Sequence, residues 1–141
     1  MKELPGDVFV TGQIDLMSLT ALVEQGTMSF INNRPNNEAF MQPDSESLSQ
    51  AAAELGVDYR HIPMAGGISP EMLKETIKAY ETLPRPIVAF CASGTRSAAL
   101  WCFAHVKSLG VDGVLEAVST SGYNLGQLRE PLNEFLKNSD T

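Results

Sequence analysis

The chain has 141 residues, of which 43% are hydrophobic and 19% are charged, a composition that predicts one folded domain over residues 1–141. Its net charge of −7 argues against nucleic acid or an anionic membrane as a partner, but a small anion can still bind where local donors gather. The start of the chain lacks the apolar core of a signal peptide, and we find no apolar run that could span a bilayer, so we expect a cytoplasmic protein.

Short apolar strands alternate with helical segments along the chain. Asp15 and Ser69 are N-cap residues for two of the helices, and Gly110 is a helix terminator. The expected strands are 8–14, 27–32, 57–63 and 86–90, and the expected helices are 16–24, 43–55, 70–81, 96–109, 114–118 and 125–136. This alternation predicts an α/β fold of three layers, with a mainly parallel sheet of four to five strands and helices on both faces.

Ligands of such sheets bind at the carboxyl ends of the strands. Four loops are expected there, and they converge on one site if the architecture is right. These loops are Gly12-Gln13, 33–38, 64–68 and 91–96.

The last of these loops begins with Cys91 and ends with Arg96, directly before a helix. Backbone N–H groups at a helix start point into the preceding loop, and the helix dipole adds positive potential. Gly94 allows a tight turn or a close approach to a ligand. The pattern predicts an anion-binding loop in which the donors and Arg96 favour the thiolate of Cys91, a candidate nucleophile. The alternative is a buried cysteine followed by a surface arginine.

The backbone N–H groups expected to hold the anion are those of Ala92, Ser93, Gly94, Thr95 and Arg96. The second cysteine, Cys102, lies within the following helix and is expected to pack in the core. Two cysteines and two histidines without close spacing predict no disulfide scaffold, no metal site and no cofactor.

Six segments cover most of the chain in order and carry a family resemblance. They are Thr11-Gly12-Gln13, Ile31-Asn32-Asn33-Arg34-Pro35 with Glu38, Tyr59-Arg60-His61-Ile62-Pro63, Gly66-Gly67-Ile68-Ser69-Pro70, 91–97 and Gly122-Tyr123-Asn124-Leu125. With them the chain resembles the bacterial phosphatase-like domain of β-lactamase hydrolase-like proteins, whose members are also catalogued as sulfur transferases. The resemblance implies a fold similar to dual-specificity phosphatases. Some relatives are fused to persulfide dioxygenases, which implies a role in sulfide metabolism and a dioxygenase as a candidate partner.

Two reactions can use a thiolate in an anion-binding loop. Cysteine phosphatases carry a histidine before the cysteine and five residues between the cysteine and the arginine, whereas here Phe90 precedes Cys91 and four residues precede Arg96. Dual-specificity relatives also place an acidic residue shortly after an Ile-Pro pair, but Ile62-Pro63 is followed by Met64-Ala65-Gly66-Gly67, which includes no carboxylate. Sulfur transfer needs no acid, because its leaving group is already a good one.

We therefore expect a rhodanese-type sulfurtransferase that carries sulfur as a Cys91 persulfide, from thiosulfate or a persulfide to a thiol acceptor. The first alternative is a cysteine phosphatase that acts through a phosphocysteine on Cys91, with Glu38 as a substitute acid. The second is a non-catalytic module that binds a persulfide or an anion, and a catalytically dead domain would carry an unreactive thiol.

The remaining candidate residues have less specific roles. Ser97 is expected to hydrogen-bond the thiolate or to be a helix-surface hydroxyl. Arg34 either extends the anion site or pairs with Glu38 as a loop clamp. His61 is expected to be a packed strand histidine rather than a proton shuttle. The resemblance alone places Gln13 and Tyr123 at the site, and Gln13, Gly66 and Gly67 are candidate substrate-binding residues together with Arg34 and Glu38.

Overall fold

The computed structural model describes residues 1–139, which form a five-stranded sheet in the order β1-β2-β5-β3-β4. The strands are β1 (Lys2–Leu4), β2 (Val8–Thr11), β3 (Ser29–Asn32), β4 (Asp58–His61) and β5 (Ile87–Phe90). Strand β1 pairs with β2 in antiparallel orientation, and all other neighbours are parallel. The predicted mainly parallel sheet is confirmed.

The first strand was not expected from the sequence. Residues Lys2–Leu4 pair with Val8–Val10 through a tight turn in which Gly6 has φ +91° and Asp7 has φ 59°. A strand of three residues shows no alternation that could be recognised beforehand. Leu4 is the one buried side chain of this strand. It packs in a core cluster that also contains side chains from the C-terminal half of the chain.

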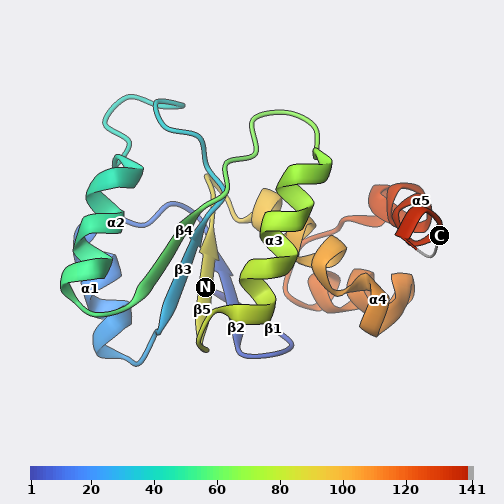
Figure 1. Ribbon diagram of the computed structural model, residues 1–141, viewed down its shortest axis with the longest axis horizontal. Helices are drawn as coiled ribbons and strands as arrows, with labels where there is room; N and C mark the ends of the chain where they lie inside the picture. The colour runs from blue at the N-terminus through green and yellow to red at the C-terminus, as the bar shows by residue number, and fades with distance from the viewer. Residues whose placement is uncertain (140–141) are drawn as a thin grey trace.

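The described residues form five α-helices, of which α1 and α2 lie on one face of the sheet and α3 and α4 on the other, while α5 packs against α4 at the end of the molecule (Figure 1). They are α1 (Leu16–Glu24), α2 (Ser45–Glu54), α3 (Pro70–Thr82), α4 (Thr95–Thr120) and α5 (Arg129–Ser139), with a 3-10 turn at Gly126–Leu128. The predicted N-caps form, since Asp15 accepts a hydrogen bond from Ser18 N and Ser69 accepts one from Met72 N. The fold class predicted from the sequence is confirmed.

The buried strands β3 and β5 supply side chains to both faces of the sheet, because successive residues of a strand point in opposite directions. Phe30, Val88 and Phe90 pack on the α1–α2 side, whereas Ile31 and Ala89 pack on the α3–α5 side. The two cores hold β5 at the centre of the sheet, so the loop that follows it starts from a rigid position.

Helix α4 is long and apolar, and by length and composition alone it could cross a membrane, which the sequence analysis did not expect. Half of its most apolar window is buried inside the protein. Gly110 has φ 79° and ψ 164°, so it interrupts the helix where the sequence predicted a terminator. Buried side chains on both sides of this break, among them Trp101 and Val114, belong to the core. Core packing therefore accounts for the composition of α4.

Candidate active site

The loops after the parallel strands meet at one edge of the sheet, as expected. The loop after β2 lies against the loop after β5, because Gln13 N donates to Ala92 O at 3.3 Å. A Cβ at Gly12 would lie 2.8 Å from that same carbonyl oxygen, so only glycine allows this approach. The loop after β3 joins them through the hydrogen bond from Asn33 N to Phe90 O, 2.8 Å long.

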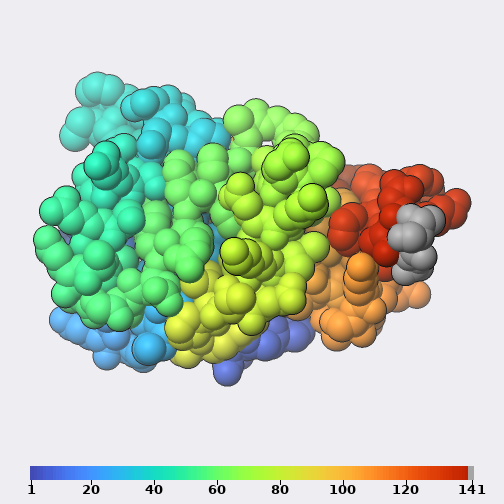
Figure 2. Space-filling view, viewed as in Figure 1, coloured from blue at the N-terminus to red at the C-terminus, as the bar shows by residue number. Residues whose placement is uncertain are grey.

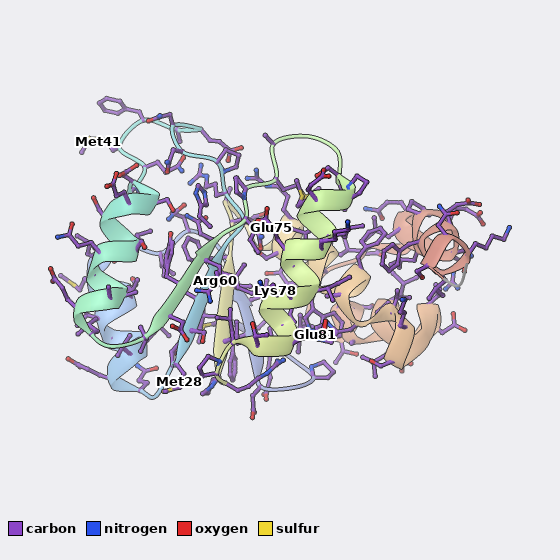
Figure 3. The ribbon with its side chains drawn as sticks, viewed as in Figure 1. Met28, Met41, Arg60, Glu75, Lys78 and Glu81 are labelled. Atoms are coloured by element: carbon purple, nitrogen blue, oxygen red, sulfur yellow. The ribbon has the colours of Figure 1, made fainter. Side chains whose placement is uncertain are left out.

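Figure 2 shows that the loop after β3, segment 33–44, and segment 64–68 form separate projections at the same end of the molecule. Figure 3 places Met41 at the outer tip of the first projection, and Met28 at the opposite end of the protein. The base of the second projection is tied to the site, since Met64 N donates to Asn33 O and Met64 O accepts from Arg96. The strand ends thus bring all four predicted loops together.

The thiol of Cys91 is fully buried at the centre of this edge, and Gly94 N donates to its sulfur at 3.0 Å. Burial by itself raises the pKa of the Cys91 thiol. Backbone hydrogen bonds from Ser97, Ser93, Gly94 and Arg96 favour the thiolate, and their combined effect lowers the pKa below the ordinary cysteine value. The loop therefore holds Cys91 as a candidate nucleophile.

Tyr123, from the segment after α4, covers the same loop. Its hydroxyl donates to Ser93 O at 3.3 Å, and a Cβ at Gly94 would lie 2.2 Å from the hydroxyl oxygen. Gly94 also has φ +96°, which other residues rarely adopt. Burial and, secondly, the charge of Cys91 raise the pKa of Tyr123, so the phenol stays neutral. The resemblance placed Tyr123 at the site, and its side chain does contact the cysteine loop.

Glu38 lies between two arginines, an arrangement that we call the Glu38 clamp (Arg34, Glu38 and Arg96). Arg96 donates to both carboxylate oxygens, at 2.8 and 2.9 Å, and Arg34 Nε donates to Oε1 at 2.9 Å. Hydrogen bonds from Arg96 and then from Arg34 lower the pKa of Glu38 to about 2. Arg34 also donates to Gln13 Oε1 at 3.1 Å. Of the two interpretations of Arg34, the structure shows the pairing with Glu38.

Arg96 connects this clamp to the nucleophile. Its pKa is raised chiefly by the hydrogen bond to Glu38, and the negative charge of Cys91 adds to the effect. Its Nη1 also donates to Met64 O at 2.8 Å. The guanidinium is thus held by the Glu38 carboxylate and the Met64 carbonyl, close enough to Cys91 for its charge to be felt, rather than as a free surface side chain.

Other predicted residues lie around this centre in different roles. Ser97 is fully buried, so the helix-surface alternative is wrong, and its hydroxyl has no hydrogen-bond partner within residues 1–139. The hydroxyls of Ser93 and Thr95 face each other at 3.1 Å. His61 Nε2 lies 2.8 Å from Arg34 O, as expected of a packed strand histidine. It borders a depression whose rim includes Arg60, Glu75 and Lys78 (Figure 3).

The glycines of the 64–68 loop are exposed, and their predicted role in substrate binding stays a prediction. A Cβ at Gly66 or Gly67 would meet no other atom within 4 Å, so close packing does not require either glycine. Sequence reasoning did not anticipate that the Met64 carbonyl accepts a hydrogen bond from Arg96, since a backbone acceptor cannot be recognised from the residue type. Among the described residues, no three His, Cys, Asp or Glu side chains are grouped so that they could hold a metal ion.

Several solved structures are similar to this chain over most of its length. A solved structure from Neisseria meningitidis, provisionally described as a phosphatase, is 25% identical, has a TM-score of 0.81, and the alignment covers 95% of this chain and 96% of that one. One from Shewanella putrefaciens, described in the same way, is 13% identical with a TM-score of 0.75, covering 97% and 91%. The core catalytic domain of a PP-IP phosphatase from S. cerevisiae is 14% identical with a TM-score of 0.69, covering 94% and 83%.

No curated protein matches the chain in sequence. The two more distant structures show a common fold with phosphatases. A family model, described as the phosphatase-like domain of β-lactamase hydrolase-like proteins, matches residues 1–108, which include the cysteine loop and the Glu38 clamp. The chain therefore belongs to the family of phosphatase-like domains of β-lactamase hydrolase-like proteins.

Proposed function

We propose that the chain is a cysteine-dependent phosphatase, a hydrolase that transfers a phosphoryl group first to Cys91 and then to water. The observation that carries this proposal is the buried Cys91 sulfur, at which backbone N–H groups of the 93–97 segment converge. The family and the fold of its neighbours support phosphoryl transfer more than the sulfur transfer that the sequence favoured.

The first step forms a bond between Cys91 and phosphorus. The N–H groups of the loop and Arg96 bind the phosphoryl oxygens, and the thiolate attacks phosphorus from the opposite side to the leaving group. The sulfur electron pair forms the S–P bond while the P–O bond breaks, and its electron pair remains on the leaving oxygen. The anion-binding loop thus holds the substrate and the nucleophile in one place.

The second step returns the enzyme to its resting state. Water attacks phosphorus, the S–P bond breaks, and its electron pair returns to Cys91 as the thiolate. One water proton stays on the released phosphate and the other leaves to solvent. The same N–H groups that lower the pKa of Cys91 also make its thiolate a good leaving group in this step.

The test is to trap the intermediate. The full chain and a Cys91→Ser variant are mixed with p-nitrophenyl phosphate and quenched in acid within one turnover, and their intact masses are recorded. We expect one added phosphoryl group on the wild type and none on the variant, together with steady release of nitrophenol. A wild type without added mass and without nitrophenol release would contradict the proposal.

A second candidate function is sulfur transfer, and one observation favours it. Four residues separate Cys91 from Arg96, and Glu38, the carboxylate paired with Arg96, is held by two arginines. In this reaction the thiolate attacks the outer sulfur of thiosulfate, the S–S bond breaks, sulfite leaves with the electron pair, and Cys91 carries a persulfide. A thiol acceptor and a persulfide dioxygenase as partner belong to this candidate, whereas a cytoplasmic location is proposed for either function.

The same mass measurement separates the two functions. Incubation with thiosulfate adds one sulfur atom to the wild type if Cys91 carries a persulfide, and cyanide removes it. Uptake of sulfur without uptake of phosphoryl would favour the sulfurtransferase, and the rate of sulfur removal by a thiol would separate an enzyme from a passive carrier.

A further inference from the structure

We propose that the Cys91 site acts on substrates whose leaving group departs without receiving a proton, that is, aryl phosphates, acyl phosphates or phosphoanhydrides, and does not cleave alkyl esters such as phosphoserine. The inference rests on the proposed function and names its substrate class. It comes from the observation that the side chains able to donate a proton at this site are already engaged in other hydrogen bonds.

Glu38 is the carboxylate beside Arg96, and both of its oxygens are already occupied. Oε1 accepts from Arg34 Nε and Arg96 Nη2, and Oε2 accepts from Arg96 Nη1. A proton on either oxygen would displace a guanidinium N–H group and separate the ion pairs. With a pKa of about 2, roughly one Glu38 in 10⁵ carries a proton at pH 7. Glu38 is thus poorly suited to be a general acid.

Two other carboxylates are present in the described loops at this edge of the sheet, and each has another position. Asp15 accepts from Ser18 N as the cap of α1, which lowers its pKa. Asp44 precedes α2, where its charge acts on the Tyr59 hydroxyl. The segments 64–68, 91–97 and 122–126 contain no Asp or Glu. None of the carboxylates in these described loops is therefore placed to protonate the leaving oxygen.

Tyr123 is a further side chain with an acidic proton, and it contacts the loop that holds Cys91. Its hydroxyl proton is directed to Ser93 O, and burial raises the pKa of the phenol. A neutral phenol can donate a hydrogen bond, but its position on the loop carbonyl makes it a support of the loop. We include Tyr123 in the test because a phenol is chemically able to protonate an alkoxide.

A missing proton donor has a measurable consequence. The leaving oxygen then keeps the full charge of the broken P–O bond, so the reaction slows as the leaving group becomes more basic. General acids contribute about 10²–10⁴-fold to such reactions, and they contribute most where the leaving group is most basic. An aryl oxide, a carboxylate or a phosphate can leave unaided, whereas an alkoxide cannot.

The experiment measures kcat/KM for the full chain with a series of substituted phenyl phosphates, together with acetyl phosphate, pyrophosphate and phosphoserine. We expect kcat/KM to fall steeply along the series, by about 10²-fold or more from nitrophenyl to phenyl phosphate, with no detectable cleavage of phosphoserine. Equal rates along the series, or cleavage of phosphoserine, would overturn the inference while leaving the proposed phosphatase intact. A failure to hydrolyse any member, with no phosphoryl group on Cys91, would overturn both.

Two variants sharpen the result. Glu38→Gln and Tyr123→Phe each remove one candidate proton donor while keeping the size of the side chain. We expect the slope of log kcat/KM against leaving-group pKa to be the same in both variants as in the wild type, whatever happens to the absolute rates. A slope that becomes steeper in either variant would identify that residue as a general acid and would contradict the inference.

Discussion

Cys91 and Cys102 are both fully buried, yet the pKa of Cys91 lies below the ordinary cysteine value and the pKa of Cys102 lies above it. Burial raises the pKa of Cys102 to about 12, because nothing in its surroundings favours the thiolate. Burial acts on Cys91 in the same sense, but several backbone N–H groups at the start of α4 outweigh it. The difference is one of position, since N–H groups at a helix start are free to bind an anion and those inside the helix are already used.

Replacement of the two cysteines tests this comparison with the largest effect. We expect Cys91→Ser to lose phosphatase activity by at least about 10³-fold, because the reaction has no other nucleophile. Cys102→Ala is the matched control, and it should keep its activity while losing about 1 kcal/mol of unfolding free energy from the small cavity left in the core. Activity assays and urea unfolding measure both, and an active Cys91→Ser protein would contradict the assigned role.

The next test changes the loop without touching its thiol. Gly94→Ala forces a side chain into a left-handed backbone and against the Tyr123 hydroxyl, so the N–H groups should move away from Cys91. We expect activity to fall about 10²-fold and the pKa of Cys91 to rise, measured as the pH dependence of iodoacetamide alkylation.

Gly126→Ala serves as its control, because a Cβ there would meet only Asn124 at 4.0 Å and the backbone is not left-handed. This variant should match the wild type in activity and in alkylation. If Gly94→Ala also matched the wild type, the arrangement of N–H groups would not be the cause of the difference between the two cysteines.

A smaller effect is expected from the phenol that supports the loop. Tyr123→Phe removes the hydrogen bond to Ser93 O, so we expect activity to fall a few-fold, by about 1 kcal/mol of transition-state stabilisation. The alkylation midpoint of Cys91 should shift as well. Tyr59→Phe is the matched control, since its hydroxyl bonds to Asn32 and Ser45 near α2, and it should lower stability and leave the alkylation midpoint of Cys91 unchanged.

The smallest effect concerns the Glu38 clamp and its dependence on pH. The pKa of Glu38 is lower in the folded protein than in the unfolded chain, so its contribution to stability is present above pH 4.5 and is lost as the pH falls toward about 2. Solvent screening keeps this contribution below about 1 kcal/mol. Urea unfolding of the wild type and of Glu38→Gln should therefore differ at pH 7 and converge near pH 2.

Glu54→Gln, an exposed residue near the end of α2, controls for the loss of one negative charge. It should show no comparable convergence. A gap between the wild type and Glu38→Gln that stays constant from pH 7 to pH 2 would show that the carboxylate is not held by the two arginines in solution.

Much of the fold could be predicted from the sequence because its signals are local. The caps Asp15 and Ser69 and the terminator Gly110 act within a few residues of their own position. The cysteine loop is local as well, since its donors all lie within the next six residues, namely the N–H groups of Ser93, Gly94, Arg96 and Ser97. The strand β1 escaped prediction because its three residues acquire their role only by pairing with β2.

The tertiary structure decided which charged side chains surround Cys91 and which side chain packs over its loop. Glu38 and Arg96 are 58 residues apart, and the sequence did not indicate that they would pair. Tyr123 reaches Ser93 across 30 residues, after the whole length of α4. The sequence by itself determined that a thiol would lie at a helix start, because that depends on neighbouring backbone groups alone. Which carboxylate meets which arginine depends on how distant loops return to one edge of the sheet, and only packing of the two cores sets that return.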